Sequence, residues 1–393
     1  MSLKIAIFQP EPDGHHLVYV RYILGPLLAA GHTVTLVTTD RVIESVAFEM
    51  IKERFEGQFS IVKMEDVPTP ESAGIREKLR GQFGRWKAYN KAYLSLPKQD
   101  AIFMVNLDRA DHAMAVKGSP FGPSPYTGFL FGRHFHLAGG ARNAIEKISF
   151  QRLLKIPSLK SILVVDPEFA ESQKGSIVRF IPDAAYIEFV DTERSLRREL
   201  GIQPEQRVCL MFGSLTPRKG VAEFLSALDS PECHQDVVGL LVGKQDDDVQ
   251  KLLRENRATR LIESDRLFVL PGFADNEVQS MAFTECDCVW AGYIDWLGGS
   301  GVLVQAAASG KPILANKDGH VGKEVLQNGL GLAVDILNPE MTSQALNQLT
   351  SQALNQLTSK AEQYKDAGLA YAKDRTIETF AKSVVESIEG CAQ

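Results

Sequence analysis

The stretch that decides the fold is WLGGSGVLVQAAASGKPILA, residues 296–315. A glycine-rich loop leads into a run of small residues that predicts a helix from Ser300, and the apolar run 312–315 predicts a buried strand. The first N–H groups of a helix have no acceptor within it, so they suit an anionic group such as a phosphate. Gln305 lies about one turn beyond Gly301, so its side chain can return to the same end. We therefore predict an anion site at this helix start, formed by Ser300, Gly301, Val302 and Gln305.

Short apolar runs alternate with stretches of helix-like spacing along the whole chain. Such alternation builds parallel, doubly wound sheets that bind a ligand beyond the carboxyl ends of their strands. We predict an α/β protein with two Rossmann-like, doubly wound domains facing a cleft, residues 1–182 and 183–375. An amphipathic last helix in residues 376–393 follows them. The expected strands are 5–8, 34–38, 61–63, 101–105, 127–131 and 162–165 in the first domain, and 208–212, 237–242, 267–270, 287–290, 313–315 and 332–334 in the second.

Composition places the chain among globular proteins, because 44% of its 393 residues are apolar and 23% are charged. No apolar run reaches the roughly 18–20 residues of a membrane span, and residues 4–9 read as a strand rather than a signal peptide. Five cysteines are scattered along the chain, with one Cys-x-Cys pair at Cys286 and Cys288. That pair lies in an apolar segment without a second pair, which favours reduced thiols over zinc ligands. We therefore expect a cytoplasmic protein.

Charge is divided unevenly along the chain. Residues 1–180 hold 23 Lys and Arg against 18 Asp and Glu, whereas residues 181–393 hold 20 against 31. The basic first half predicts contact with an anionic surface, such as the inner face of a membrane or a lipid-phosphate acceptor, with a chance imbalance as the alternative. The acidic total of −6 and the lack of a recognisable module argue against a nucleic-acid partner.

The most basic segment of the first half is residues 76–93, which hold six Lys and Arg. Its aromatic residues are spaced three to four apart, which predicts a helix with an aromatic stripe on the core. The second interpretation is an interfacial helix beside a lipid-linked acceptor. The aromatic residues are Phe83, Trp86, Tyr89 and Tyr93.

Two adjacent cations follow the first expected strand of the second domain, in GSLTPRKG, residues 213–220. Arg218 supplies a planar fork and Lys219 a point charge, and both suit phosphate oxygens. A solvated basic turn is the alternative. The three acids at 246–248, after the next strand, are of the kind that begins a helix, so we prefer a helix start there to a metal site.

Polar residues also follow three strands of the first domain, at the edge where a doubly wound sheet binds its ligand. For the histidines, an exposed helix start or an ordinary surface loop is the alternative. The candidates are Gly14, His15 and His16 after the first strand, Asp108 after the fourth, and His134 and His136 after the fifth.

These motifs together resemble the GT-B glycosyltransferases of the retaining, family-four kind, over nearly the whole chain. In that family two glutamates with seven residues between them flank the donor loop, and here those positions hold Leu297 and Gln305. The family's diphosphate segment carries an arginine, an acid and a lysine. Here Ser214 stands at the arginine, Arg218 at the acid, and Lys219 matches.

The resemblance implies that the last helix, in residues 376–393, crosses back onto the first domain. It also implies a role for each remaining candidate. Gly14 and His15 belong to the loop that lets the acceptor and the donor phosphate approach. Gly243 ends a strand at the donor site, Phe273 packs beside the nucleotide base, and Gln305 takes the place of the acid that holds the ribose hydroxyls. The histidines His134 and His136, with Asp108 as a further candidate, are implied to lie near the reacting sugar.

The resemblance implies transfer of a sugar from a nucleotide diphosphate sugar to a saccharide or lipid-linked acceptor, with retention, in polysaccharide or glycolipid synthesis. Arg218, Lys219 and the helix start at 300–302 would carry the phosphate charge, so no metal or other cofactor is expected. Two alternatives stay open. One is a GT-B-fold protein that only binds a nucleotide sugar, and the other is an epimerase acting on the nucleotide sugar itself.

Overall fold

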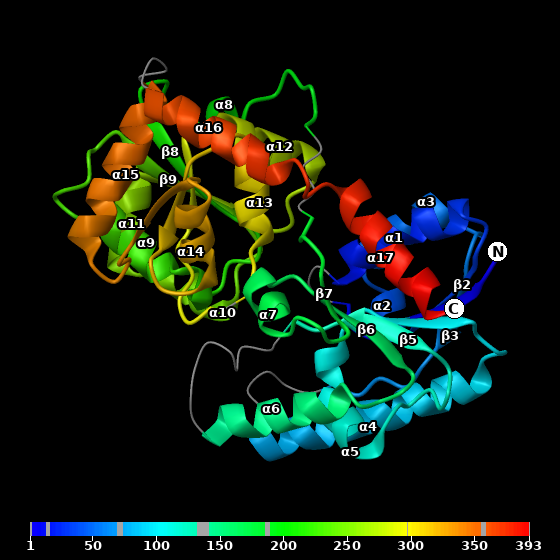
Figure 1. The fold of residues 1–393 in the computed structure, drawn as a ribbon. Helices are drawn as coiled ribbons and strands as arrows, with labels where there is room; N and C mark the ends of the chain where they lie inside the picture. The colour runs from blue at the N-terminus through cyan, green and yellow to red at the C-terminus, as the bar shows by residue number, and fades with distance from the viewer. Residues whose placement is uncertain are drawn as a thin grey trace. The chain divides into compact units, whose positions relative to one another are not determined.

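The computed structural model describes residues 2–12, 16–68, 74–131, 141–184, 189–296, 298–354 and 359–392. The chain divides into two compact units, Met1–Pro182 with Ile377–Gln393, and Asp183–Thr376. Each unit is built around a parallel sheet with helices packed on it (Figure 1). This confirms the prediction of two Rossmann-like α/β units. No helix among the described residues has the length and apolar character needed to cross a membrane.

The sheet of the first unit has the strand order β3-β2-β1-β4-β5-β6-β7, and all its pairings are parallel. The central strands are buried on both faces, as parallel sheets require, and therefore read as continuous apolar runs. The strands are β1 (Lys4–Gln9), β2 (Thr33–Thr38), β3 (Ser60–Lys63), β4 (Ala101–Met104), β5 (Tyr126–Phe129), β6 (Leu159–Val164) and β7 (Val178–Phe180).

The seventh strand, β7, corrects the prediction of six strands in this unit. It is only three residues long and lies at the edge of the sheet, with Arg179 and Phe180 exposed. A short edge strand needs no apolar run, so periodicity does not reveal it.

Helices cover both faces of the first sheet (Figure 1). On one face lie α1 (His16–Ala29), α3 (Val46–Phe55) and α17 (Ile377–Cys391), and on the other lie α4 (Ile75–Ser95), α5 (Asp111–Lys117) and α6 (Ala141–Leu153). The short α2 (Asp40–Ile43), η1 (Leu107–Arg109) and α7 (Pro167–Ser172) lie in the connections.

Aromatic stacking anchors the C-terminal helix α17 to the first unit. The rings of Phe380 and Phe129 are 5.6 Å apart at an interplanar angle of 6°, and Tyr19 of α1 lies 4.6 Å from Phe380. Ring pairs at such distances add to the free energy gained by burying the rings. The C-terminal helix α17 therefore packs into the same hydrophobic core as α1 and β5.

The sheet of the second unit has the strand order β10-β9-β8-β11-β12-β13, again with all pairings parallel. All six strands expected from the sequence are present. They are β8 (Arg207–Phe212), β9 (Val237–Gly243), β10 (Leu267–Pro271), β11 (Cys288–Ala291), β12 (Ile313–Asn316) and β13 (Gly331–Val334).

The connections of the second unit are mostly helical (Figure 1). They are α8 (Leu196–Leu200), η2 (Pro217–Lys219), α9 (Val221–Leu228), α10 (Asp247–Leu252), α11 (Asn256–Glu263), α12 (Asn276–Glu285), α13 (Gly301–Ala308), α14 (His320–Gln327), α15 (Pro339–Leu354) and α16 (Ser359–Ala372).

Candidate functional site

The two loops with most of the predicted donor residues, 213–220 and 292–300, follow neighbouring strands of the second sheet. β8 and β11 pair with each other. After β8 the chain passes through α9 to β9, toward one edge of the sheet. After β11 it passes through α13 to β12, toward the opposite edge. The two connections diverge at this point, which is where doubly wound α/β proteins bind their ligands.

The two loops are held together by backbone contacts. The Ile294 N–H donates to the carbonyl oxygen of Arg218 at 2.8 Å, and the Trp290 indole N–H donates to that of Lys219 at 2.7 Å. Gly220 has a φ of 69°, and a Cβ at this position would lie 2.4 Å from the Gly292 oxygen. Only glycine fits there, so the end of the basic motif is fixed against the opposite loop.

Lys219 is a buried cation, only 9% exposed. Its amine donates to the backbone oxygen of Phe212, the last residue of β8, and lies 5.9 Å from the centre of the Tyr293 ring. Among the described residues it forms no ion pair with a carboxylate. Burial, followed by the nearby charge of Arg218, lowers the pKa of Lys219 to about 7. A buried amine without an acidic partner is a favourable position for an anionic ligand.

Arg218 has different surroundings from Lys219, although the two are adjacent in sequence. It is exposed, and its guanidinium carbon lies 3.9 Å from the centre of the Trp296 ring. The Trp296 indole N–H donates to the Gly299 oxygen at 3.0 Å. The ring therefore connects Arg218 with the glycine-rich loop by a cation–π contact, while Lys219 lies inside the unit.

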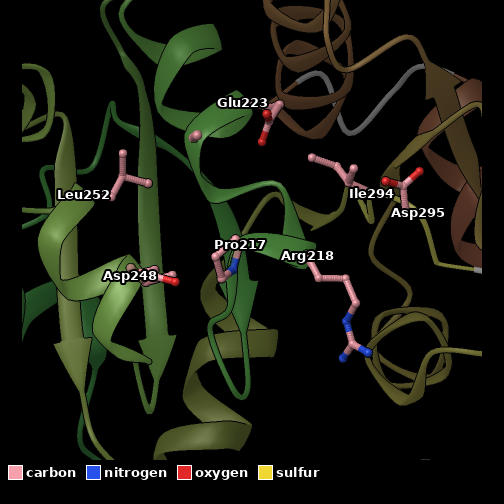
Figure 2. A pocket seen from close by; sticks show the side chains of 9 residues that line it. Pro217, Arg218, Glu223, Asp248, Leu252, Ile294 and Asp295 are labelled. Atoms are coloured by element: carbon pink, nitrogen blue, oxygen red, sulfur yellow. The ribbon is translucent and has the colours of Figure 1, made fainter. Parts of the chain in front are cut away.

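A pocket of about 460 Å³ lies beside Arg218, between the starts of α9 and α10 and the loop after β11 (Figure 2). Three carboxylates and one guanidinium line it, so its net charge is wrong for a phosphate group. The pocket is lined by Pro217, Arg218, Ala222, Glu223, Asp248, Val249, Leu252, Ile294 and Asp295.

At the start of α13, backbone N–H groups are available to a ligand, whereas the Ser300 hydroxyl is not. Ser300 is the N-cap, and its Oγ accepts from the Leu303 N–H at 3.3 Å. The same Oγ lies 2.9 Å from the Tyr293 hydroxyl, so Ser300 is already engaged. The backbone N–H groups of Gly301 and Val302 have no acceptor within the described part of the chain. They are the groups of this predicted site that remain available to an anion.

Gln305 lies half-buried in the second turn of α13. Its side-chain oxygen is buried and has no hydrogen-bond partner among the described residues. A buried oxygen without a donor costs about 1–3 kcal/mol. A donor from a ligand, such as a sugar hydroxyl, would remove that cost.

Three other predicted residues lie at the carboxyl edge of the same sheet. Ser214 follows β8 and is exposed, and Phe273 follows β10 with 83% of its surface exposed. Gly243 ends β9 with a φ of 138°, and a Cβ there would lie 1.9 Å from the Gly213 oxygen. The glycine therefore lets the ends of β8 and β9 approach each other closely.

Asn316 belongs to this region, although the sequence analysis does not select it. It is 8% exposed at the end of β12, and its Nδ2 donates to the Tyr293 oxygen at 2.9 Å. Its Oδ1 accepts from the Asp318 N–H at 3.4 Å. Asn316 thus fixes the loop after β11. The sequence feature that could have identified Asn316 is its position as a polar residue at the end of a buried apolar run.

The acid run at 246–248 begins a helix, as predicted. The Asp246 carboxylate accepts from the Val249 N–H at 2.9 Å and caps α10. Within the described ranges, no group of three or more His, Cys, Asp or Glu side chains is arranged to hold a metal ion. The five cysteines are buried and free.

In the first unit, Asp108 lies in η1, directly after β4. Its Oδ2 accepts from the Phe131 N–H at 2.7 Å, so the carboxylate anchors the chain just before residues 132–140. An ion pair that the sequence analysis does not identify lies nearby, with the Glu11 Oε2 2.7 Å from the Arg109 Nε.

The His16 ring Nε2 lies 3.4 Å from the Asn106 side-chain nitrogen. Five predicted or compared positions lie outside the described residues: Gly14, His15, His134, His136 and Leu297.

Comparison with known proteins supports this assignment of the fold. Residues 192–369 match the family described as glycosyl transferases group 1. No curated protein matches the sequence. Among solved structures, Anabaena HepE in complex with UDP-glucose has a TM-score of 0.70 at 17% identity, covering 99% of this chain and 100% of HepE.

Two further structures cover nearly the whole chain. Sucrose-phosphate synthase from Thermosynechococcus elongatus has a TM-score of 0.72 at 15% identity, covering 99% of this chain and 98% of its own. WaaG, a glycosyltransferase involved in lipopolysaccharide biosynthesis, has a TM-score of 0.65 at 15% identity, covering 98% of this chain and 100% of its own. The chain therefore has the GT-B fold, and its residues 192–369 match the model of the glycosyl transferases group 1 family.

Proposed function

We propose that this protein transfers a sugar from a nucleotide diphosphate sugar to an acceptor. The observation that carries the proposal is the amine of Lys219 at the switch point of the second sheet, which is buried and has no carboxylate partner among the residues that the structure describes. Contacts through Tyr293 and Ser300 connect it with the open amides of Gly301 and Val302. The HepE complexes with UDP and UDP-glucose support a nucleotide sugar as the donor.

The proposed reaction breaks the bond between the anomeric carbon and the diphosphate oxygen. The acceptor oxygen bonds to that carbon, and the diphosphate leaves with increased negative charge. Lys219 and the two amides stabilise this charge, a task that divalent metals perform in other enzymes, so we propose a metal-independent transfer. We also propose that Arg218 supports the diphosphate from the rim. Retention is proposed from the resemblance to the family-four enzymes.

Gln305 and Phe273 complete the proposed donor site. The unpartnered oxygen of Gln305 would accept from a ribose hydroxyl, and the exposed Phe273 ring would pack on the base. Ser214 and Gly243 border the same edge.

We propose a saccharide or lipid-linked acceptor, bound by the first unit, and a role in polysaccharide or glycolipid synthesis. The glycosyltransferase WaaG, involved in lipopolysaccharide biosynthesis, supports this direction. Gly14, His15, His134 and His136 remain candidates for contact with the acceptor or the reacting sugar. Asp108 would act by anchoring the segment that carries the two later histidines.

Calorimetry over uridine, guanosine and adenosine diphosphates and their sugars tests donor binding, with Lys219→Met as the site variant. Lys251→Met, on the exposed face of α10, is the matched control. We expect loss of binding of about tenfold or more for the site variant only. Equal affinity of both variants would contradict the donor site.

Turnover tests the enzyme against the binding-only alternative, which Leu297 and Gln305 favour because they replace two family glutamates. Hydrolysis or transfer is measured with each donor that binds. We expect His134→Ala or His136→Ala to lower turnover about tenfold with nucleotide affinity unchanged. A parent protein that binds a donor but neither hydrolyses nor transfers it, even with acceptor extracts, would support the binding-only function.

A further inference from the structure

The outward face of α4 carries a row of four cations, Arg76, Arg80, Lys87 and Lys91, all exposed. At 100° per residue these positions fall within an arc of roughly 60° on the helix. Leu94, which is 72% exposed, lies in the same arc. We call these five residues the α4 row. It extends for about 27 Å along the helix at 1.5 Å per residue.

The remaining sides of α4 fix the helix to the first unit. Tyr89 is 1% exposed and packs in the core, so the aromatic stripe faces inward as the sequence predicted. The Trp86 indole N–H donates to the Gly118 oxygen at 2.8 Å, and the Asn90 amide donates to the Pro120 oxygen at 2.7 Å. The helix backbone that carries the α4 row is therefore held in place on the first unit.

Within the described ranges, Lys91 is the one member of the α4 row with an acidic side chain at ion-pair distance. Lys91 lies 3.7 Å from Glu65, but both side chains are mostly exposed, so water weakens that pair. Among the residues 75–95 of the helix, the one acid is Glu77, which lies outside the arc. A straight row of cations with an exposed leucine matches the headgroups and the shallow apolar layer of an anionic membrane.

The same geometry disfavours a nucleic acid. Binding of single strands relies on exposed aromatic rings as stacking platforms, whereas Tyr89 is buried and Trp86 is held by a hydrogen bond.

We propose that α4 docks the protein on anionic membrane surfaces through the α4 row. This interaction goes beyond the proposed sugar transfer and does not depend on the donor site. It would place the first unit beside lipid-linked molecules, with each basic residue near the leaflet strengthening binding by roughly fivefold.

Cosedimentation of the full chain with vesicles tests the proposal. The vesicles contain phosphatidylcholine alone or with about 30% phosphatidylglycerol, at about 0.1 M salt. We expect the parent protein to bind the anionic vesicles at least about tenfold more strongly than the neutral ones, and high salt to abolish the difference.

The test variant replaces the four cations of the α4 row with glutamine: Arg76→Gln, Arg80→Gln, Lys87→Gln and Lys91→Gln. The control makes the same change of charge at four exposed lysines elsewhere: Lys52→Gln, Lys174→Gln, Lys251→Gln and Lys382→Gln. We expect about a tenfold or greater loss of binding for the test variant and little change for the control. If the fourfold variant fails to fold, the pairs Arg76→Gln with Arg80→Gln and Lys87→Gln with Lys91→Gln are measured separately, and each should lose about threefold or more.

Several results would overturn the proposal. They are equal binding to both vesicle types, parental binding by the folded α4 variants, an equal loss in the control, or tighter binding of single-stranded RNA through the same row. Nucleotide diphosphate affinity is measured on all variants. The proposed donor site is in the second unit, whereas the α4 row is in the first. A loss of nucleotide affinity would therefore contradict the proposed function, and a loss of vesicle binding alone would concern only the membrane proposal.

Discussion

The side-chain amine of Lys219 donates its hydrogen bond to the backbone oxygen of Phe212, at the end of β8. This bond turns the amine inward, so that a residue of a basic surface motif becomes one of the buried polar groups of the second unit. The buried position explains why its pKa falls to about 7, with the charge of Arg218 as the second cause.

The first prediction concerns the pH dependence of nucleotide binding. Lys219 carries its charge below about pH 7 and loses it as the pH rises. A bound diphosphate stabilises the charged form, so we expect affinity to fall between about pH 7 and 9, with proton uptake on binding near pH 8. Calorimetry in buffers with different ionisation enthalpies measures that uptake. In the Lys219→Met variant, nucleotide affinity should not change with pH in this range. If the affinity of the parent protein is also independent of pH, the lysine does not titrate in this range.

Lys219 should also affect the stability of the free protein. Because its pKa is lower in the folded than in the unfolded chain, the unfolded chain binds the extra proton between about pH 7 and 10.4. The stability that this residue contributes therefore rises with pH across that window. Lys219→Met should raise the unfolding free energy at pH 6 by about 1–3 kcal/mol while weakening nucleotide binding. A destabilised variant in denaturant titration would contradict this.

Gln305 provides a test of the register of the donor loop. Its unpartnered oxygen should accept from a ribose hydroxyl, so Gln305→Leu should weaken nucleotide binding by about 1–3 kcal/mol. Gln305→Glu keeps the acceptor and should be tolerated. Affinities from titration calorimetry decide the point, and a leucine variant that binds like the parent would remove Gln305 from the site.

The two cations of the basic motif should contribute unequally. Replacing both Arg218 and Lys219 with alanine should cost roughly 2–4 kcal/mol of diphosphate binding. We expect most of this loss in the Lys219 single variant, because Arg218 is exposed and stacked on Trp296. If Arg218→Ala alone accounts for the loss, the guanidinium leaves the tryptophan ring to bind the ligand.

A side-chain clamp joins the two ends of the first unit. The His32 Nδ1 accepts from the Leu3 N–H at 3.1 Å, so its Nε2 carries the proton that it shares with the Glu389 carboxylate at 2.8 Å. Glu389→Ala leaves the buried ring without this acceptor and should lower the unfolding free energy by about 1–3 kcal/mol. Glu386→Ala, on the exposed side of α17, is the matched control and should have little effect. Thermal melts of both variants measure the difference.

A second clamp, between α14 and α16, should make the second unit sensitive to acid. Burial raises the pKa of Glu324, but bonds from His320 and Tyr371 and the charge of Arg375 outweigh it and lower the pKa. Stability from a lowered acid pKa is present above its unfolded value and is lost as pH falls through the folded value.

The Tyr371 hydroxyl donates to Glu324 at 2.9 Å, so Tyr371→Phe should cost about 1–2 kcal/mol near pH 7 and less at acidic pH. Denaturant titrations at a series of pH values measure this. A cost that stays constant down to acidic pH would assign the effect to packing instead.

One element differs from the sequence-based prediction for a local reason. The charged run 192–200 predicts a helix from Thr192, but α8 begins at Leu196, because the Ser195 side chain accepts from the Arg198 N–H and caps the helix there. The duplicated octapeptide at 342–349 and 350–357 reads as an extension of a surface helix. In α15, Thr342, Leu346 and Leu349 are fully buried, while Gln344 and Gln348 are exposed, because a polar repeat can still present one apolar face to the core.

Apart from the short edge strand β7, the sequence by itself determined the order of the strands, because each buried parallel strand must read as an apolar run bounded by helix-forming segments. It also placed the predicted donor residues at strand ends, which a parallel sheet brings to one edge. Which strands would be neighbours, and what each side chain would contact, depended on packing between segments far apart in the chain. Only the tertiary structure shows that Lys219 points inward and that Ser300 caps a helix. It also shows that Arg218 stacks on Trp296 and that Asn316 contacts the loop after β11. Hydrogen bonds and burial between distant segments decide these positions.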